Sequence, residues 1–566
     1  MKTTQHRYLV LLLLLSISFG SCNFLDFDET NGLKTKEDMY KYFNSTESML
    51  THVYSFMPQD FGAVDGAMRD CASDDAEFAN VAGNIKNLTN GGWSPTKTVD
   101  TSWNLYTGIR AANSFLSELK NVDFSRYQYE PNYKHWMRKL EQFPEEAKVL
   151  RAHYFFELAR RYGDIAMPLT VLSSEEANAI PKTKFNDVIE FIIKECDEAA
   201  TVLPDSYEGE FGKQTGRVTK GFAQAVKSKA LLYAASKLHN STMDPELWKR
   251  SAKAAHDIIE GNIYQLDKDV FEKTTTSKEV IMLRMNEENR NFELNNFPIR
   301  FTEGSRTGNV ATATFPTQNL VDAFRTKNGH SVVLTDKGWM TDDASFDSKR
   351  PYENRDSRLY RTVLANGMKF KDKIIESYVG GLDDVTITAG GTPTGYFLRK
   401  YIQESTSFTP DNVVSKKHHW IVYRYAETLL TYAESMANAY PSDMSYVDSE
   451  LSKSALWALN EVRKNANMPD VQNCSYDEFM QLLRDEWRVE FAFEDHRFWD
   501  IRRWKIGDTT QRVIMGVKVL KNVEGSFEFA KTVLKSRVWK DAMYLYPLPQ
   551  EEIFKNKNLN PQNIGW

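Results

Sequence analysis

The stretch LLRDEWRVEFAFEDHRFWDIRRWKIGD, from Leu482 to Asp508, holds arginines, carboxylates and aromatic residues at a higher density than other parts of the sequence. Three kinds of structure have this composition: an active site, a platform that binds sugars, and a core element with charged edges. Leu483, Trp487, Phe491, Glu494 and Phe498 follow steps of three or four residues, and Leu482, Val489, Phe493 and Trp499 widen the apolar side. This periodicity predicts an amphipathic helix that packs against the core.

The charges of this stretch also favour a structural role. Glu490 and Glu494 lie one helical turn apart, a spacing at which like charges destabilise an exposed helix. We therefore expect tertiary arginine partners, such as Arg502 or Arg503, to neutralise them. The stretch is interpreted as a core helix with a buried or half-buried ionic edge.

Upstream, helical patterns dominate. The segment EEAKVLRAHYFFELARRYGDIAMP, Glu145–Pro168, has an apolar stripe at helical spacing, and Gly163 followed by Pro168 marks its end. Alanines such as Ala230 and Ala433 recur where helices would cross, which is typical of tetratricopeptide-type helical hairpins. Further helices are expected over 186–203, 219–239, 245–260, 424–440 and 452–466.

The middle of the chain differs. Between about residues 268 and 417 the helical pattern fades, and Gly, Thr, Asn and Asp become frequent, as in GGLDDVTITAGGTPTGY. That stretch lacks the strand–loop–helix order of a phosphate-binding loop. Residues from about 513 to 548 alternate like short strands. Long irregular segments on a regular scaffold tend to carry function.

The N-terminus reads as a secretory signal over residues 1–21, with a basic start and a short apolar run. Cys22 follows Gly20 and Ser21, as in a bacterial lipobox, although Phe19 stands where Leu is usual. We predict lipidation of Cys22; the alternative is an ordinary signal peptide with a cysteine nearby. Asn23 in place of Asp favours sorting to the outer membrane. No later stretch reaches the 18 or so apolar residues of a spanning helix.

Composition excludes several classes of protein. The chain has 71 basic and 77 acidic residues, and removal of the leader takes away the basic Lys2 and Arg7. The net charge of the mature chain is therefore negative, which argues against nucleic acid as a partner. Cys71, Cys196 and Cys474 are an odd number without CxxC spacing, so at most one disulfide and no zinc site are expected. The 13% aromatic content could supply ring faces for sugar binding.

Catalytic and metal motifs are lacking. The sequence has no GxSxG, HExxH or Walker pattern. His418 and His419 are neighbours that point in different directions on a helix or strand, so they do not predict a metal site. The acidic clusters that a glycosidase could use are Asp74–Asp75, Asp383–Asp384 and Glu486–Glu490–Glu494. Such clusters are common on solvated surfaces, and we expect no enzymatic activity and no cofactor.

Nine segments, in order from about residue 23 to 566, together resemble the SusD/RagB family of Bacteroidetes outer-membrane nutrient-binding lipoproteins. The sequence departs from the family pattern at Trp487, where Arg is frequent, and at Asp495, where Gly is frequent. The segments are WNLYTGIRAANSFLSEL, LRAHYFFELARRYGDIAMP, GRVTKGFAQAVKSKALLYAAS, FPTQNLVDAF, ENRDSRLYRTV, TGYFLRKY, RYAETLLTYAESMA, LRDEWRVEFAFEDHRFWDIRRW and YLYPLPQEEIFKNKNLNPQNIGW.

The resemblance implies a mainly α fold, with a tetratricopeptide-like scaffold of helical hairpins, a loop-rich irregular region and a few short strands. It implies a signal peptide at 1–21, an N-terminal helical region at 22–270 and a C-terminal region at 271–566, packed as one globular unit. It also implies a role. Such proteins sit on the outer membrane by a lipid anchor and deliver glycans, or in some members peptides, to a SusC-like TonB-dependent barrel.

In the family, the ligand site is generally built from the early region and mid-chain loops. Trp93 lies in a Gly-rich loop near Asp74 and Asp75, and these three residues are our first candidates for ligand contact; the alternative for Trp93 is packing. Aromatic rings stack on sugars, and carboxylates, amides and arginines bind hydroxyl pairs. Further candidates in the irregular middle are Arg290, Asn291, Arg300, Trp339 and Tyr396.

Four functions remain open from the sequence. The chain could bind glycans, bind peptides on the same scaffold, degrade glycans as a secreted enzyme, or act as a helical scaffold among envelope proteins. The resemblance favours glycan binding.

Overall fold

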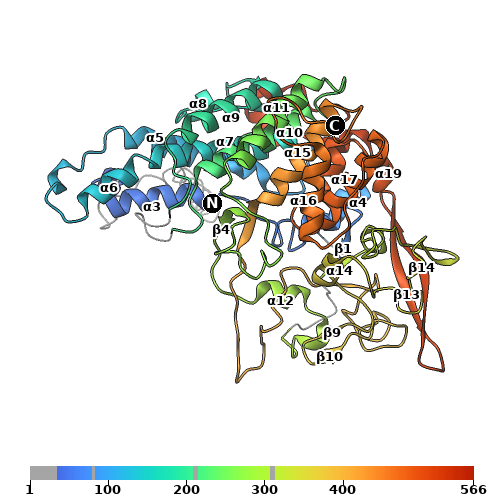
Figure 1. Ribbon diagram of the computed structural model, residues 1–566. Helices are drawn as coiled ribbons and strands as arrows, with labels where there is room; N and C mark the ends of the chain where they lie inside the picture. The colour runs from blue at the N-terminus through green and yellow to red at the C-terminus, as the bar shows by residue number, and fades with distance from the viewer. Residues whose placement is uncertain (1–34, 79–82, 208–213, 306–312) are drawn as a thin grey trace, which may run out of the picture.

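The computed structural model describes residues 35–78, 83–207, 214–305 and 313–566. Figure 1 shows a layer of helices along the upper side, an irregular loop-rich part below it, and a long hairpin at one edge. Helices hold 41% of the residues and strands 13%, so the protein is mainly α, as predicted. No helix among the described residues is long and apolar enough to cross a membrane.

The helical layer is a succession of antiparallel neighbours. Helices α5, α7, α9, α10, α11, α15 and α16 each pack against the next in this order, so that α15 continues the layer after the long irregular insertion. This arrangement confirms the predicted hairpin scaffold. The longer helices are α3 (Phe43–Tyr54), α5 (Leu105–Leu119), α7 (Phe143–Tyr162), α9 (Phe185–Ala200), α10 (Lys220–Ala235), α11 (Pro245–Glu260), α15 (Tyr425–Ala439), α16 (Ala455–Asn465) and α17 (Tyr476–Glu490).

Local sequence explains where these helices begin and end. The hydroxyl of Thr219 accepts a hydrogen bond from the backbone N–H of Phe222 and caps α10, and Asp244 caps α11 in the same way ahead of Pro245. Helix α7 ends at Gly163, whose φ of 71° favours glycine. These signals are visible in the sequence, and the boundaries of α11 match the prediction.

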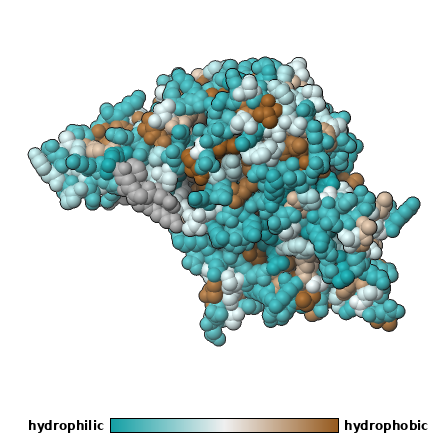
Figure 2. Space-filling model, viewed as in Figure 1, coloured by the Kyte–Doolittle hydropathy of each residue, from teal (hydrophilic) through white to brown (hydrophobic). Residues whose placement is uncertain are grey.

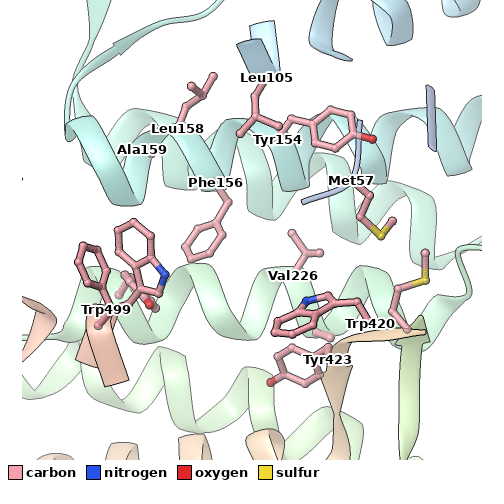
Figure 3. Close-up of a cluster of buried hydrophobic side chains, with 14 of the residues drawn as sticks. Met57, Leu105, Tyr154, Phe156, Leu158, Ala159, Val226, Trp420, Tyr423 and Trp499 are labelled. Atoms are coloured by element: carbon pink, nitrogen blue, oxygen red, sulfur yellow. The ribbon is translucent and has the colours of Figure 1, made fainter. Parts of the chain in front are cut away.

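The core lies between neighbouring helices and the strands beneath them. In Figure 3, Phe156 of α7 and Val226 of α10 point into the same buried space as Trp499, with Trp420 on the strand side. The guanidinium of Arg160 lies 4.2 Å from the centre of the Trp499 ring. Burial of side chains of this size contributes about 1.5–3 kcal/mol each.

The sheets are small antiparallel pairs that tie distant segments together. The hairpin of β13 and β14 is longer than the short strands predicted for this region. The pairs are β1 (Ala76–Phe78) with β5 (Thr314–Pro316), β2 (Ile165–Ala166) with β3 (Lys182–Thr183), β4 (Val280–Arg284) with β12 (Trp420–Arg424), β6 (Val333–Thr335) with β7 (Gly338–Met340), β8 (Val363–Leu364) with β11 (Phe397–Leu398), β9 (Lys369–Phe370) with β10 (Lys373–Ile374), and β13 (Val513–Lys521) with β14 (Phe527–Ser536).

Short helices connect these parts. They are α2 (Lys36–Met39), α4 (Asn84–Asn90), α6 (Tyr133–Leu140), α8 (Ser174–Ala177), α12 (Asn291–Asn296), α13 (Gln318–Val321), α14 (Ser357–Thr362), α18 (Arg497–Arg503), α19 (Gly507–Thr510) and α20 (Gln550–Lys555). Cys71, Cys196 and Cys474 are free. Cys22 lies outside the described residues, and the boundary at 270/271 stays a prediction.

The arginine-rich stretch at 482–508 is not one helix, as the sequence periodicity had suggested. Helix α17 ends at Glu490, and α18 begins only at Arg497. Between them, Phe493 and Asp495 adopt φ angles of 63° and 59°, a left-handed conformation that no continuous helix allows. This conformation explains why glycine suits the position of Asp495.

The partners of the two glutamates also differ from the prediction. Glu490 and Glu494 are buried and do meet tertiary arginine, but it is Arg424 of β12, with Nε 2.8 Å from Glu494 and Nη1 2.7 Å from Glu490. Arg503 instead pairs with Glu434, because the break before α18 turns it toward α15. The stretch is a structural core with a buried ionic network.

Candidate functional site

Asp74 and Asp75, the first candidates from the sequence, lie in the interior. Nε of Arg497 donates to Oδ1 of Asp74 over 2.8 Å, and Nε of Arg488 donates to Oδ1 of Asp75 over 2.6 Å. Burial raises the pKa of Asp74, but the Arg488 and Arg497 charges outweigh it and bring the pKa to about 2. Both carboxylates are buried, which leaves no surface for a ligand.

Trp93 is also buried, at 3% exposure. Its ring meets those of Tyr546 and Trp566 edge to face, with centroids 5.1 and 4.6 Å away. The packing alternative therefore describes Trp93, and the site proposed below does not use it. The prediction that Trp93 contacts a ligand relied on a local property, because a Gly-rich loop is usually exposed. In the fold, the C-terminal end of the chain covers this loop.

The candidates in the irregular middle are dispersed. Tyr396 is fully buried and donates to Oε1 of Gln318 over 2.6 Å. Nε of Arg300 donates to Oδ1 of Asp383 over 2.8 Å, so this arginine is neutralised. Trp339 is half-buried on β7. The structure does not bring these residues together into one site.

Asn291, by contrast, opens onto a cavity of about 240 Å³ between two segments far apart in the chain. One wall is the segment 59–68, after α3, and the other is 286–296, which follows β4 and includes α12. We call this cavity the amide pocket. Its lining consists of Gln59, Phe61, Gly62, Gly66, Met68, Asn286, Glu287, Asn289, Asn291, Phe292, Asn295, Asn296 and His418.

A tight turn shapes the first wall. The backbone N–H of Gly66 donates to the carbonyl of Gly62, and Val64 bridges to Ala67. Gly62 has a φ of 76°, and a Cβ at this residue would lie 3.3 Å from the Cα of Gly66. Glycine is therefore needed here on both conformational and steric grounds.

An amide pair joins the two walls. Nδ2 of Asn286 donates to Oε1 of Gln59 over 2.6 Å and to the carbonyl of His418 over 2.7 Å. Among the described residues, this pairing leaves Nε2 of Gln59 as a donor and Oδ1 of Asn286 as an acceptor on the two residues that line the pocket. A sugar hydroxyl is itself both donor and acceptor, so two hydroxyls can satisfy both groups at once.

Buried contacts hold the second wall in place. Nε2 of His418 lies 2.7 Å from Oε1 of Glu293, and the backbone N–H of Asn286 donates to Nδ1 of His419 over 3.1 Å. Burial lowers the pKa of His419, which keeps its ring neutral and able to accept this bond. Asn286 is thus fixed by both its backbone and its side chain.

Aromatic carbon forms the inner side of the amide pocket. Phe61 is half-buried, and its ring meets those of Phe292 and Trp420 edge to face at 5.0 and 4.9 Å. Apolar ring surface beside fixed amides is the combination that sugar binding requires, because a sugar has apolar C–H faces and a polar hydroxyl edge. Figure 2 shows that the visible face of the molecule is mostly hydrophilic, with hydrophobic residues scattered over it.

Sequence reasoning identified Asn291 and its neighbour Arg290 but missed Gln59, Phe61 and Asn286. A signal existed, since five asparagines fall within Asn286–Asn296. The guanidinium of Arg290 packs over the Phe408 ring at 5.3 Å. The contribution of Gln59 could not be found locally, because the fold alone brings it to a segment more than 200 residues away.

A larger cavity of about 420 Å³ lies where the loop-rich part meets α14 and α17. Several of its charged side chains pair with one another: Nη2 of Arg399 lies 2.7 Å from Oε1 of Glu404, and Nη1 of Arg358 lies 2.7 Å from Oε2 of Glu490. Among the described residues, no group of three or more His, Cys, Asp or Glu side chains could hold a metal ion. The amide pocket is therefore the stronger candidate for a ligand.

Comparison with known families agrees with this fold. Residues 278–566 match the family model described as "SusD family", and residues 23–232 match the one described as "Starch-binding associating with outer membrane". The chain belongs to the SusD family. Two separate matches that together cover most of the chain explain why markers of this family occur from the early helices to the C-terminus.

Individual SusD-like proteins are distant in sequence but similar in structure. SusD-like protein P2 of Formosa agariphila is 24% identical over 446 residues, covering 76% of this chain and 75% of that protein. A SusD-like protein of Bacteroides fragilis superposes with a TM-score of 0.75 at 24% identity, over 94% of this chain and 99% of the other. A SusD-like carbohydrate-binding protein of the same species gives 0.71 at 23% identity, over 92% and 100%.

Proposed function

We propose that this SusD-family protein captures glycans at the bacterial surface through the amide pocket. The observation that carries the proposal is the Asn286–Gln59 pair, which presents a fixed donor and acceptor beside the half-buried ring of Phe61. The match of residues 23–232 to a family model described as "Starch-binding associating with outer membrane" supports the same proposal.

The carboxylates that a glycosidase would need are engaged elsewhere. Asp383 pairs with Arg300, and Glu486 pairs with Arg358 and Arg463. A general acid has to reach the glycosidic oxygen, and buried ion pairs of this kind do not. We therefore propose binding without catalysis.

Electrophoresis in native gels that contain a polysaccharide tests this function. We expect retarded migration in at least one gel of a panel, without release of reducing sugar, and loss of the retardation in Asn286→Ala. Asn121→Ala, on the exposed surface after α5, is the control. Calorimetric heat with peptides and no retardation by any polysaccharide would instead favour peptide capture.

We further propose that Cys22 carries the lipid anchor and that the protein delivers its ligand to a SusC-like TonB-dependent barrel. An acyl anchor would keep the amide pocket near the membrane without a spanning helix. Mass spectrometry of the N-terminal peptide tests the first part. Co-purification with an outer-membrane barrel tests the second part. If Cys22→Ala abolishes co-purification, the association depends on the anchor; if co-purification is unaffected, the protein binds the barrel directly.

A further inference from the structure

The lining of the amide pocket, as far as the described residues form it, contains no lysine or arginine. Three arginines that neighbour lining residues in the chain are directed elsewhere. Nε of Arg69 lies 3.0 Å from Oδ1 of Asp495. Arg290 packs over Phe408, and Arg284 donates to the backbone carbonyl of Met57. The histidine in the lining, His418, is occupied by Glu293. Lys416, which bridges to Asn289, and Lys417 lie beside the lining but are not part of it, so no cationic group in the lining itself is available to a ligand.

The lining does contain a carboxylate. Glu287 is exposed and stands between Asn286 and Asn289 on the second wall. A carboxylate accepts hydrogen bonds from hydroxyl groups but repels a carboxylate or sulfate on a ligand. Proteins that recognise acidic groups place arginine or lysine against them, because these side chains supply charge-assisted hydrogen bonds.

The remaining polar groups are amides that suit hydroxyls. Oδ1 of Asn289 is already occupied by the backbone N–H of Asn291 over 2.9 Å, which fixes the start of α12. The side-chain amide of Asn291 is exposed at the rim, with no hydrogen bond from any described residue. Together with the Gln59–Asn286 pair, it offers matched donors and acceptors and no net positive charge.

We propose that the amide pocket selects uncharged sugar residues and rejects uronic-acid and sulfated ones. This inference rests on the proposed function and adds the chemical class of the ligand. The selection has two parts: hydroxyl pairs satisfy the Gln59 and Asn286 amides, and Glu287 penalises an anionic group in the same space.

The test compares matched polysaccharides in native gels. Neutral probes are soluble starch, laminarin, arabinoxylan and galactomannan, and acidic probes are polygalacturonate, alginate and carrageenan. We expect retardation only by neutral probes. The neutral probe that retards most should bind about ten-fold more weakly after carboxymethylation, because an anion would then be desolvated beside Glu287 without a cationic partner.

Glu287→Gln removes the repelling charge while keeping the shape of the side chain. It should bind the carboxymethylated probe about two- to five-fold more tightly than the wild type does and the neutral probe equally well. Glu175→Gln, an exposed glutamate on α8, is the control and should change neither. If acidic probes retard the protein, or if carboxymethylation of the neutral probe leaves its affinity unchanged, the proposed selection for uncharged sugars is wrong, while the proposal of glycan binding stands. No retardation by any probe overturns glycan binding itself and this inference with it.

Discussion

Nδ2 of Asn286 donates a hydrogen bond to Oε1 of Gln59 over 2.6 Å, although the two residues are 227 positions apart in the chain. This contact joins the segment after α3 to the segment after β4 and creates the amide pocket between them. The helical layer and the loop-rich part thus meet at the groups that we propose to bind the ligand.

Loss of this contact should weaken ligand binding. Asn286→Ala removes one acceptor in the pocket and frees the side chain of Gln59, and we expect about a ten-fold rise in Kd for the retarding polysaccharide. The variant also loses the two hydrogen bonds that join the walls, so we expect the free energy of unfolding to fall by about 1–3 kcal/mol while the protein stays folded. An unchanged Kd, measured by isothermal titration, would contradict the role of the pair.

The turn at Gly62 should matter for binding beyond its effect on stability. Gly62→Ala imposes a left-handed φ on alanine, which costs about 1–2 kcal/mol, and crowds Gly66. Gly367→Ala is the matched control, because Gly367 has a φ of 84° with open space around it. Both variants should be destabilised, but only Gly62→Ala should lose polysaccharide affinity.

The buried network at Arg424 should dominate stability among the ion pairs. Arg424→Met leaves Glu490 and Glu494 without their shared partner and should lower the free energy of unfolding by about 3–5 kcal/mol. Lys253→Met breaks an exposed pair with Asp257 and should cost less than about 1 kcal/mol. Chemical denaturation measures both. Equal effects would show that the network is not structural.

Acid sensitivity should arise from buried glutamates such as Glu427. Burial raises its pKa, but the charges of Lys229 and His496 outweigh burial and lower the pKa from 4.5 to about 2. A lowered pKa stabilises the fold above about pH 4.5, and that contribution, about 3 kcal/mol, is lost as the pH falls toward 2. Glu427→Gln should therefore be less stable at neutral pH and show a shallower decline over this range.

Local patterns in the sequence were sufficient for the helical layer. The cap at Thr219, the Asp244–Pro245 start and the Gly163 stop act over a few residues, so the starts of α10 and α11 and the end of α7 follow from them, whereas α10 ends at Ala235, short of the predicted residue 239. The irregular middle was also predicted from local patterns, because the helical periodicity fades there.

Long-range pairing was beyond local patterns. The break between α17 and α18 depends on left-handed backbone at Phe493 and Asp495, which periodicity does not encode. The sequence around Asp74 is typical of a surface loop, and its burial depends on the ion pair with Arg497, 423 positions later in the chain. Gln59 is likewise unremarkable in its own segment. The candidate site therefore emerged from the fold, with only Asn291 foreseen from the sequence.

The most direct test of the account is a crystal structure with an oligosaccharide of the retarding polysaccharide. We predict sugar in the amide pocket, with hydroxyls within hydrogen-bonding distance of Nε2 of Gln59 and Oδ1 of Asn286 and a C–H face against Phe61. Sugar bound in the larger cavity beside Arg399, with the amide pocket empty at saturating ligand, would contradict it.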